Sequence, residues 1–355
     1  MPDESVPTLE LGPAGEINTS TKKIYLDHAH WVEMSKVRIG RDVTADSRKC
    51  YEVLAQAVHD GDATIFLSET SYIEMQVASG NLDQRTNIAN VMSELTRFAS
   101  IGSRQEIFEG QFVAALHERF GRPVWPVKPQ VYGRGYGWAF DGSKTEARIA
   151  LAGLAELRTG DPVFLSGLTE REWELQEFIE YIVLRGTAEY MGDIQQIFDV
   201  DEAKQLIESR ATADNYTQEQ IILSEELKTR VDDPICTSIY VNDFGRQLPR
   251  LLSLGGMSFD SFFHQTKDEL TNFLRAMPSF AVQIALRRQA AKNATRDWST
   301  NDARDLDHHS LSIPYCDAVL TDRAAVDALS RAKIPEKLGT SIFARPRELT
   351  AWLSD

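Results

Sequence analysis

The sequence predicts an α/β fold, in which a parallel β-sheet flanked by helices carries a large all-helical insertion. Strand-like and helix-like patterns alternate over residues 22–100, and the same alternation returns over residues 296–355. Such alternation is typical of chains that build a parallel sheet. Between these segments, residues 101–295 show mostly amphipathic helical patterns. We therefore expect one core made of the two outer segments, a helical insert between them, and a disordered tail over residues 1–21.

The first half of the core begins with KKIYLD (22–27), a short β-rich run that ends in an acid. Apolar residues at helical spacing predict helices over residues 31–37 and 46–60. A second strand, ATIFLS (63–68), follows, and its last residue, Ser68, is the predicted N-cap of a helix that reads ETSYIEMQV. Strand, helix, strand, helix is the beginning of a parallel α/β unit.

The second half of the core mirrors the first. NDARDLDHHSLSIPYC (301–316) is a predicted helix stopped by Pro314, and DAVLTD (317–322) is a strand that again ends in an acid. A helix is expected over residues 323–332, and TSIFARPRELTAWL (340–353) predicts a last strand and a helical turn. The second half therefore supplies two more strands to the same sheet.

Composition limits the function classes. The chain has 355 residues, a formal net charge of −15 and 42% hydrophobic residues, which is ample for a packed core. No apolar stretch approaches the roughly 20 residues that span a bilayer, and the N-terminus lacks a secretory pattern. The three cysteines lie far apart without CxxC spacing, so we expect neither disulfides nor a zinc site, and a reducing, cytoplasmic setting. The acidic balance counts against nucleic-acid binding, which normally leaves a basic footprint.

Acidic residues stand at the ends of two predicted strands. Asp27 closes the first strand, and Asp322 closes the strand DAVLTD. In a parallel sheet both would lie at the carboxyl edge, where open α/β sheets place their sites. The two acids are therefore expected to be neighbours despite their separation in sequence.

Further acids belong to the helices beside this edge. Glu74 lies six residues beyond Ser68, in the first turns of its helix, and Asp305 and Asp307 lie near the start of the helix before DAVLTD. Clustered carboxylates suit Mg²⁺ or Mn²⁺. Such ions activate water and stabilise the displacement at a phosphodiester. The pattern therefore predicts a metal site made of carboxylates.

The ordered set IYLD, LSETSYIE and DLDHHSLSIPYCDAVLTDR resembles the PIN nuclease family, in particular its larger bacterial members with helical inserts. The resemblance covers about residues 22–100 and 300–355, under half of the chain. It implies a PIN-like core and a metal-dependent ribonuclease that uses Mg²⁺ or Mn²⁺. RNA would be the partner, with single-stranded DNA as a second substrate class and a protein partner at the insert.

The resemblance also implies site residues. Asp27 and Glu74 match the first two acids of the family, and Asp305 stands 16 residues before Thr321, the usual spacing of the third acid. The fourth acid normally lies two residues after this threonine, but Asp322 lies one residue after it. The predicted catalytic and metal-binding residues are thus Asp27, Glu74, Asp305 and Asp322, with Asp307 as an additional metal ligand. Asp302 and Asp307 compete with Asp305 for the third position.

Two other functions stay open. A catalytically inactive binding or interaction module on the same fold fits the shifted fourth acid and the acidic composition. A small-molecule phosphoesterase with a His/Asp metal site is suggested by four histidines near the acids, although positions around the metal site or in contact with substrate are the favoured roles of these residues: His28, His30, His308 and His309.

Two neighbouring features have their own predictions. Asp317 begins its strand, about one helix length from Asp305, so we expect a structural turn or cap role for it. A basic run over residues 287–296 would either contact phosphates or form a solvated helix face.

Overall fold

The fold is that of a computed structural model, which describes residues 17–77, 81–121, 130–141, 177, 180–186, 200–292 and 297–354. Of the expected disordered tail, residues 1–16 lie outside these ranges. Ile17 already packs against the hydrophobic core, and the first strand begins at Lys22.

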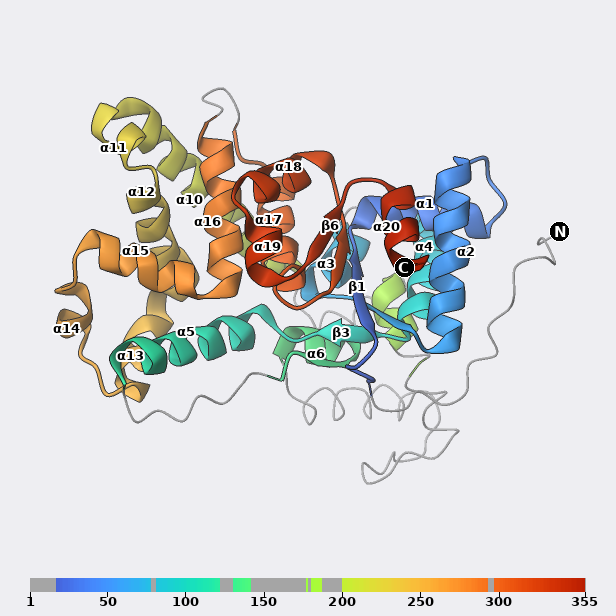
Figure 1. The fold of residues 1–355 in the computed structure, drawn as a ribbon, viewed down its shortest axis with the longest axis horizontal. Coiled ribbons are helices and arrows are strands. Elements are labelled where there is room, and N and C mark those ends of the chain that lie inside the picture. Colours follow the sequence, from blue (N-terminus) through green and yellow to red (C-terminus); the bar gives the residue numbers. More distant parts are fainter. Residues whose placement is uncertain are drawn as a thin grey trace.

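A parallel sheet with the strand order β2-β1-β5-β6 lies at the centre of the part described (Figure 1). The chain runs from β1 to β2 on one side of the sheet and from β5 to β6 on the other. The direction of winding therefore switches between β1 and β5, the place where open α/β sheets bind ligands. The strands are β1 (Lys22–Leu26), β2 (Ala63–Phe66), β5 (Ala318–Leu320) and β6 (Ser341–Phe343).

Alternate residues of the strands face two separate layers of helices. Ile24 and Leu26 of β1 belong to one buried cluster, whereas Tyr25 between them belongs to the other. This two-residue period is that of a strand buried on both faces. The helices that pack in the first cluster include α1 (His28–Arg38), α2 (Ala45–Asp60), α4 (Leu82–Thr96) and α20 (Pro346–Ser354).

The second face of the sheet carries most of the remaining helices. They include α5 (Arg104–Phe120), α16 (Pro278–Ala291), α17 (Thr300–Ser312), α18 (Arg323–Arg331) and α19 (Ile334–Leu338). Helix α3 (Glu69–Val77) follows β2 and packs against α17. The predicted α/β class and the parallel sheet are confirmed, and each strand and helix expected in the core is present.

The predicted insert consists mainly of helices. Beyond α5 and α16 they are α6 (Gly135–Asp141), α10 (Val200–Leu223), α11 (Glu225–Thr229), α12 (Asp232–Ser238), the π-helix η2 (Ile239–Phe244), the 3₁₀ helix η3 (Gly245–Gln247), α13 (Leu248–Leu254), α14 (Phe259–Phe263) and α15 (Lys267–Ala276). Part of the insert, between α6 and α10, lies outside the residues described.

The prediction that the insert is all-helical is wrong at one place. Strand β4 (Tyr132–Arg134) pairs antiparallel with β3 (Ala99–Ile101) at the boundary of the core. A strand of three residues with a glycine at its centre, Gly133, has no alternating apolar pattern. It exists because β3 offers a pairing edge, which the local sequence does not show.

The insert packs directly on the sheet. Phe108 of α5 and Phe280 of α16 lie with ring centroids 4.5 Å apart, in the same buried cluster as Tyr25 and Val319 of the sheet. The hydrophobic core therefore continues across residue 101.

Farther out, α10, α12, α14 and α15 line an apolar hollow of about 1230 Å³. Among the described residues, no helix combines the length and apolar character needed to cross a bilayer.

Candidate functional site

Asp27 directly follows β1 at the carboxyl edge of the sheet. Its backbone N–H donates to Leu320 O at 3.0 Å, which extends the pairing of β1 with β5 by one residue. Asp27 is also the N-cap of α1, yet its carboxylate makes no capping hydrogen bond. It instead accepts a hydrogen bond from Thr321 Oγ1 at 3.2 Å. Because most N-cap acids use their carboxylate for the cap, this one is left available for another role.

Glu74 reaches the same edge from α3. Its side chain is only 12% exposed, and its Oε2 lies 3.8 Å from His28 Nδ1. Burial, and next the negative charge of Asp27, raise the pKa of Glu74 to about 8. The charge of Asp305 acts in the same direction, and that of Arg304 opposes it.

Asp305 approaches from the first turns of α17. Burial, followed by the charges of Asp27 and Asp322, raises its pKa to about 7. The charge of Asp27 thus acts on both Glu74 and Asp305, and the charge of Asp322 acts on Asp305, so these acids lie near one another at this edge of the sheet. Neither Glu74 nor Asp305 accepts a hydrogen bond from the side chains or backbone described. Half-buried carboxylates without donors are costly unless a cation or a proton compensates them.

Asp322 has a different environment from the other three acids. It is exposed and forms the N-cap of α18, where Oδ1 accepts from Ala324 N at 2.6 Å and from Ala325 N at 3.0 Å. The cap occupies one carboxylate oxygen and leaves Oδ2. The one-residue shift noted in the sequence therefore corresponds to a helix cap at the rim of the site.

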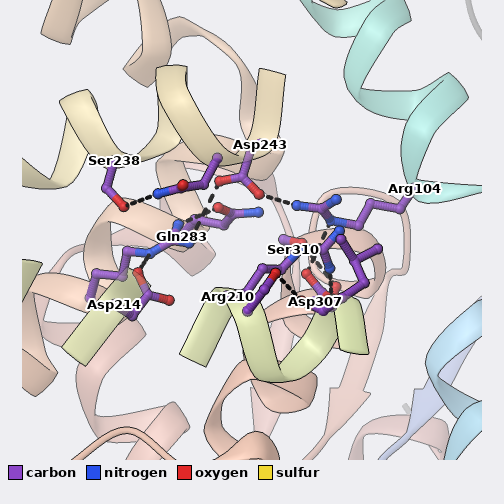
Figure 2. A network of polar contacts seen from close by, with 12 residues as sticks. Arg104, Arg210, Asp214, Ser238, Asp243, Gln283, Asp307 and Ser310 are labelled. Carbon is purple, nitrogen blue, oxygen red and sulfur yellow. Dashed lines mark hydrogen bonds and ion pairs between the residues drawn. The ribbon is translucent and has the colours of Figure 1, made fainter. Parts of the chain in front are cut away.

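Asp307 does not join this cluster. Its Oδ1 lies 3.0 Å from Arg104 Nε, and its Oδ2 lies 2.5 Å from Arg210 Nη1. Figure 2 shows this carboxylate among arginines that come from the insert. Asp305 and Asp307 are two residues apart on α17, about 200° around the helix axis, so they face nearly opposite directions. The structure thus assigns Asp307 to an ion-pair network, not to the metal site that the sequence suggested.

A threonine and a histidine form a chain of hydrogen bonds that ends at Asp27. Thr321 is fully buried, and His309 Nε2 lies 2.8 Å from Thr321 Oγ1. When the threonine proton goes to Asp27, the hydroxyl oxygen can only accept, so His309 donates from Nε2. Burial lowers the pKa of His309 to about 3, which keeps the ring neutral at pH 7. The sequence pattern alone did not predict this role of Thr321.

The other histidines also lie near the acids, and among the described residues they form no His/Asp ligand set. His30 Nε2 lies 3.5 Å from Thr321 O, and the ring centroid of His308 is 3.9 Å from that of His309. Burial lowers the pKa of His28, which lies beside Glu74. Roles around a metal or in contact with substrate stay a prediction for these histidines.

Arg304 is a residue that the sequence did not single out. It is buried on α17, and its charge lowers the pKa of both Glu74 and Asp305. Its Nη1 has no hydrogen-bond partner among the described residues, while Nε contacts Thr300 O at 3.4 Å. The only signal for Arg304 in the sequence is that a basic residue lies among the acidic residues in the first turns of α17.

The remaining predictions fall outside the cluster. Asp317 lies at the opposite end of β5, where its Oδ2 accepts from Lys23 N at 2.8 Å and pairs with Lys23 Nζ at 2.9 Å. Its expected structural role is thus visible. In the basic run, Arg287 is buried against Asp214 at 2.8 Å and Arg288 pairs with Asp232. Arg287 is therefore not part of a solvated face, whereas half of the Arg288 side chain is exposed, as expected for such a face.

The donor set of the cluster fits a hard divalent cation. Its oxygens are carboxylate oxygens, which are the usual ligands of Mg²⁺ and Mn²⁺. Two of the acids, Glu74 and Asp305, have raised pKa values and accept no hydrogen bond from the residues described. Among the described residues, however, no three His, Cys, Asp or Glu side chains are already spaced as ligands of one ion.

Comparison with known proteins adds no family. No protein-family model, no curated protein and no solved structure matches the chain.

Proposed function

We propose that the carboxyl edge of the sheet is the active site of a metal-dependent nuclease that hydrolyses phosphodiester bonds. The observation that carries the proposal is that Asp27, Glu74 and Asp305 approach one another from three separate elements, and that two of these carboxylates accept no hydrogen bond from the part of the chain that the structure describes. A site that concentrates negative charge at the winding switch of a parallel sheet is suited to bind a cation.

Asp27, Glu74 and Asp305 would hold Mg²⁺ or Mn²⁺, with Asp322 contributing through Oδ2 at the rim. Bound ions of this kind activate water and stabilise charge at phosphorus. Thr321 and His309 would fix the direction of the Asp27 carboxylate through their hydrogen bonds. Partner residues of this kind around a metal typically change metal affinity or activity by about 10- to 100-fold when they are removed.

RNA is the proposed substrate, with single-stranded DNA as the second class to test. This preference comes from the likeness of the sequence motifs to the PIN family, whose fold and chemistry are part of the same proposal. A cytoplasmic setting is also proposed, supported by the three cysteines, which are all free and buried. A protein partner at the insert stays a prediction.

A second candidate is a binding module without catalytic activity. The capping role of Asp322 favours it, as does the lack of three ligands at metal-binding spacing among the described residues. It shares the fold with the first candidate and differs in the behaviour of the acids toward cations.

Cleavage of labelled single-stranded RNA and DNA, with Mn²⁺ or with EDTA, tests the proposal. The wild type is expected to cleave RNA in Mn²⁺ and to be inactive in EDTA. Asp27→Asn should lower the rate by about 100-fold or more, as expected for loss of a main catalytic interaction. Asp317→Asn is the matched control, because this acid lies at the opposite end of the adjacent strand and should leave the rate unchanged.

Equal cleavage by the wild type and Asp27→Asn would contradict the proposal. Wild-type protein that binds RNA without cleaving it under any of these conditions would favour the binding module.

A further inference from the structure

We infer that Arg104 and Arg210 of the insert are positioning residues for Asp305, because they hold Asp307 and thereby fix the helix that carries both acids. The inference rests on the proposed function in one respect, since Asp305 is taken as a metal ligand. Its structural part, the placement of α17 by the insert, can be measured without any metal.

Asp307 is the point where the core meets an ion-pair network of the insert (Figure 2). Its two carboxylate oxygens contact Arg104 and Arg210 separately. Arg104 also pairs with Asp243 of η2, and Arg287 of α16 lies 3.6 Å from the other oxygen of Asp243. The network therefore links α17 to four elements of the insert, which are α5, α10, η2 and α16.

The charges of this network are shielded from solvent. The side chain of Asp243 is 1% exposed, and those of Arg104, Arg210 and Asp307 are 11–12% exposed. Although burial alone would raise it, the guanidinium groups of Arg104, Arg287 and Arg210 hold the pKa of Asp243 below its usual value. Removal of one partner from such a network leaves an uncompensated buried charge, which is strongly unfavourable. The geometry of Asp307 is therefore tightly constrained.

Helix geometry transmits this constraint to the acid cluster. Asp305 and Asp307 lie on nearly opposite sides of α17, so a small rotation of the helix moves both. The N-terminus of α17 is fixed separately by a capping box between Ser299 and Asp302. The network thus sets the rotation of the helix at the turn that carries Asp305, and the insert becomes part of the candidate active site.

The test compares the affinity for Mn²⁺, by calorimetry, with amide hydrogen exchange over residues 300–312 in metal-free protein. The variants are Asp307→Asn, Arg210→Met and Arg210→Lys. The control is Asp232→Asn, which weakens another partly buried cluster of one acid and two arginines, formed with Arg275 and Arg288.

Asp307→Asn and Arg210→Met are expected to weaken Mn²⁺ binding by about 10-fold, the scale of a removed supporting partner, and to speed exchange along α17. Arg210→Lys keeps one charge and should recover part of the affinity. Asp232→Asn should lower the melting temperature but keep the wild-type Mn²⁺ affinity. Because the arginine variants probe the same contact, they replace Asp307→Asn in the test if that variant does not fold.

Three results would overturn the inference: unchanged Mn²⁺ affinity in Asp307→Asn, unchanged exchange along α17, or an equal loss of affinity in Asp232→Asn. A wild type that does not bind Mn²⁺, with faster α17 exchange in Asp307→Asn, would reject the metal site while supporting the placement of α17 by the insert. Lack of binding together with unchanged exchange would reject both.

Discussion

Thr321 Oγ1 donates a hydrogen bond to Asp27 Oδ2 at 3.2 Å, which joins the ends of two neighbouring parallel strands across 294 residues of sequence. The threonine is itself contacted by His309 at 2.8 Å. This chain of contacts runs from α17, through the end of β5, to the acid that closes β1. It gives the candidate site a fixed orientation for Asp27.

Replacement of Thr321 by valine should weaken Mn²⁺ binding by about 10-fold, since a supporting hydrogen bond of an expected ligand is lost. The change should also destabilise the fold by about 1–3 kcal/mol, because His309 Nε2 would be buried without an acceptor. Calorimetric titration and urea unfolding measure the two effects. Thr321→Ser retains the hydroxyl and is the matched control. Wild-type affinity in the valine variant would show that Thr321 does not orient a ligand.

The stability of metal-free protein should fall as the pH rises from about 6.5 to 8. Glu74 has a pKa of about 8 in the folded protein instead of its usual 4.5, and Asp305 about 7 instead of 3.8. The folded state therefore binds more protons than the unfolded state in this window, so the free energy of unfolding decreases with pH. His309, whose folded pKa is about 3, is neutral in the folded protein throughout this window, and the proton that it binds in the unfolded state, with the usual pKa of 6.5, opposes the fall only near the lower end.

Glu74→Gln should make the free energy of unfolding depend less on pH. In the wild type, a saturating concentration of Mn²⁺ should restore at pH 8 the stability that is lost as the pH rises. Urea unfolding at several pH values measures both. Glu52→Gln changes an exposed carboxylate on α2 and should keep the wild-type slope. If the free energy of unfolding of Glu74→Gln falls with pH as steeply as that of the wild type, the raised pKa of Glu74 is not the cause of the pH dependence.

Asp322 should have two separable roles. Asp322→Ser keeps a good N-cap for α18 and should retain most of the stability, whereas Asp322→Ala should cost about 1 kcal/mol. Both variants should weaken Mn²⁺ binding, because both remove the carboxylate oxygen that the cap leaves over. Thermal unfolding and calorimetry distinguish these effects. Full Mn²⁺ affinity in Asp322→Ser would leave the residue as a helix cap alone.

The sequence was informative where the fold follows simple periodicity. Asp27 and Asp322 could be placed together because both end strands of one parallel sheet, and the carboxyl ends of such strands share an edge. Glu74 followed from its distance to the start of α3. None of these inferences required knowledge of the insert.

The features of the fold and of the site that the sequence did not predict depend on tertiary contacts. Asp305 and Asp307 look equivalent in the sequence, and only the arginines of α5 and α10 decide which one faces the insert. Strand β4 depends on its pairing with β3. The role of Thr321 depends on the buried imidazole of His309. Such relationships join residues far apart in sequence, and local patterns do not specify them.

The most direct test of the central claim is calorimetric titration of Mn²⁺ into the wild type and Asp27→Asn at pH 8, with Asp317→Asn as the control. The wild type and the control are expected to bind Mn²⁺ with the same affinity, and Asp27→Asn should lose at least 100-fold, on the order of 2.7 kcal/mol of binding free energy. Absence of binding in the wild type, or equal binding in Asp27→Asn, would contradict a metal centre at this edge of the sheet.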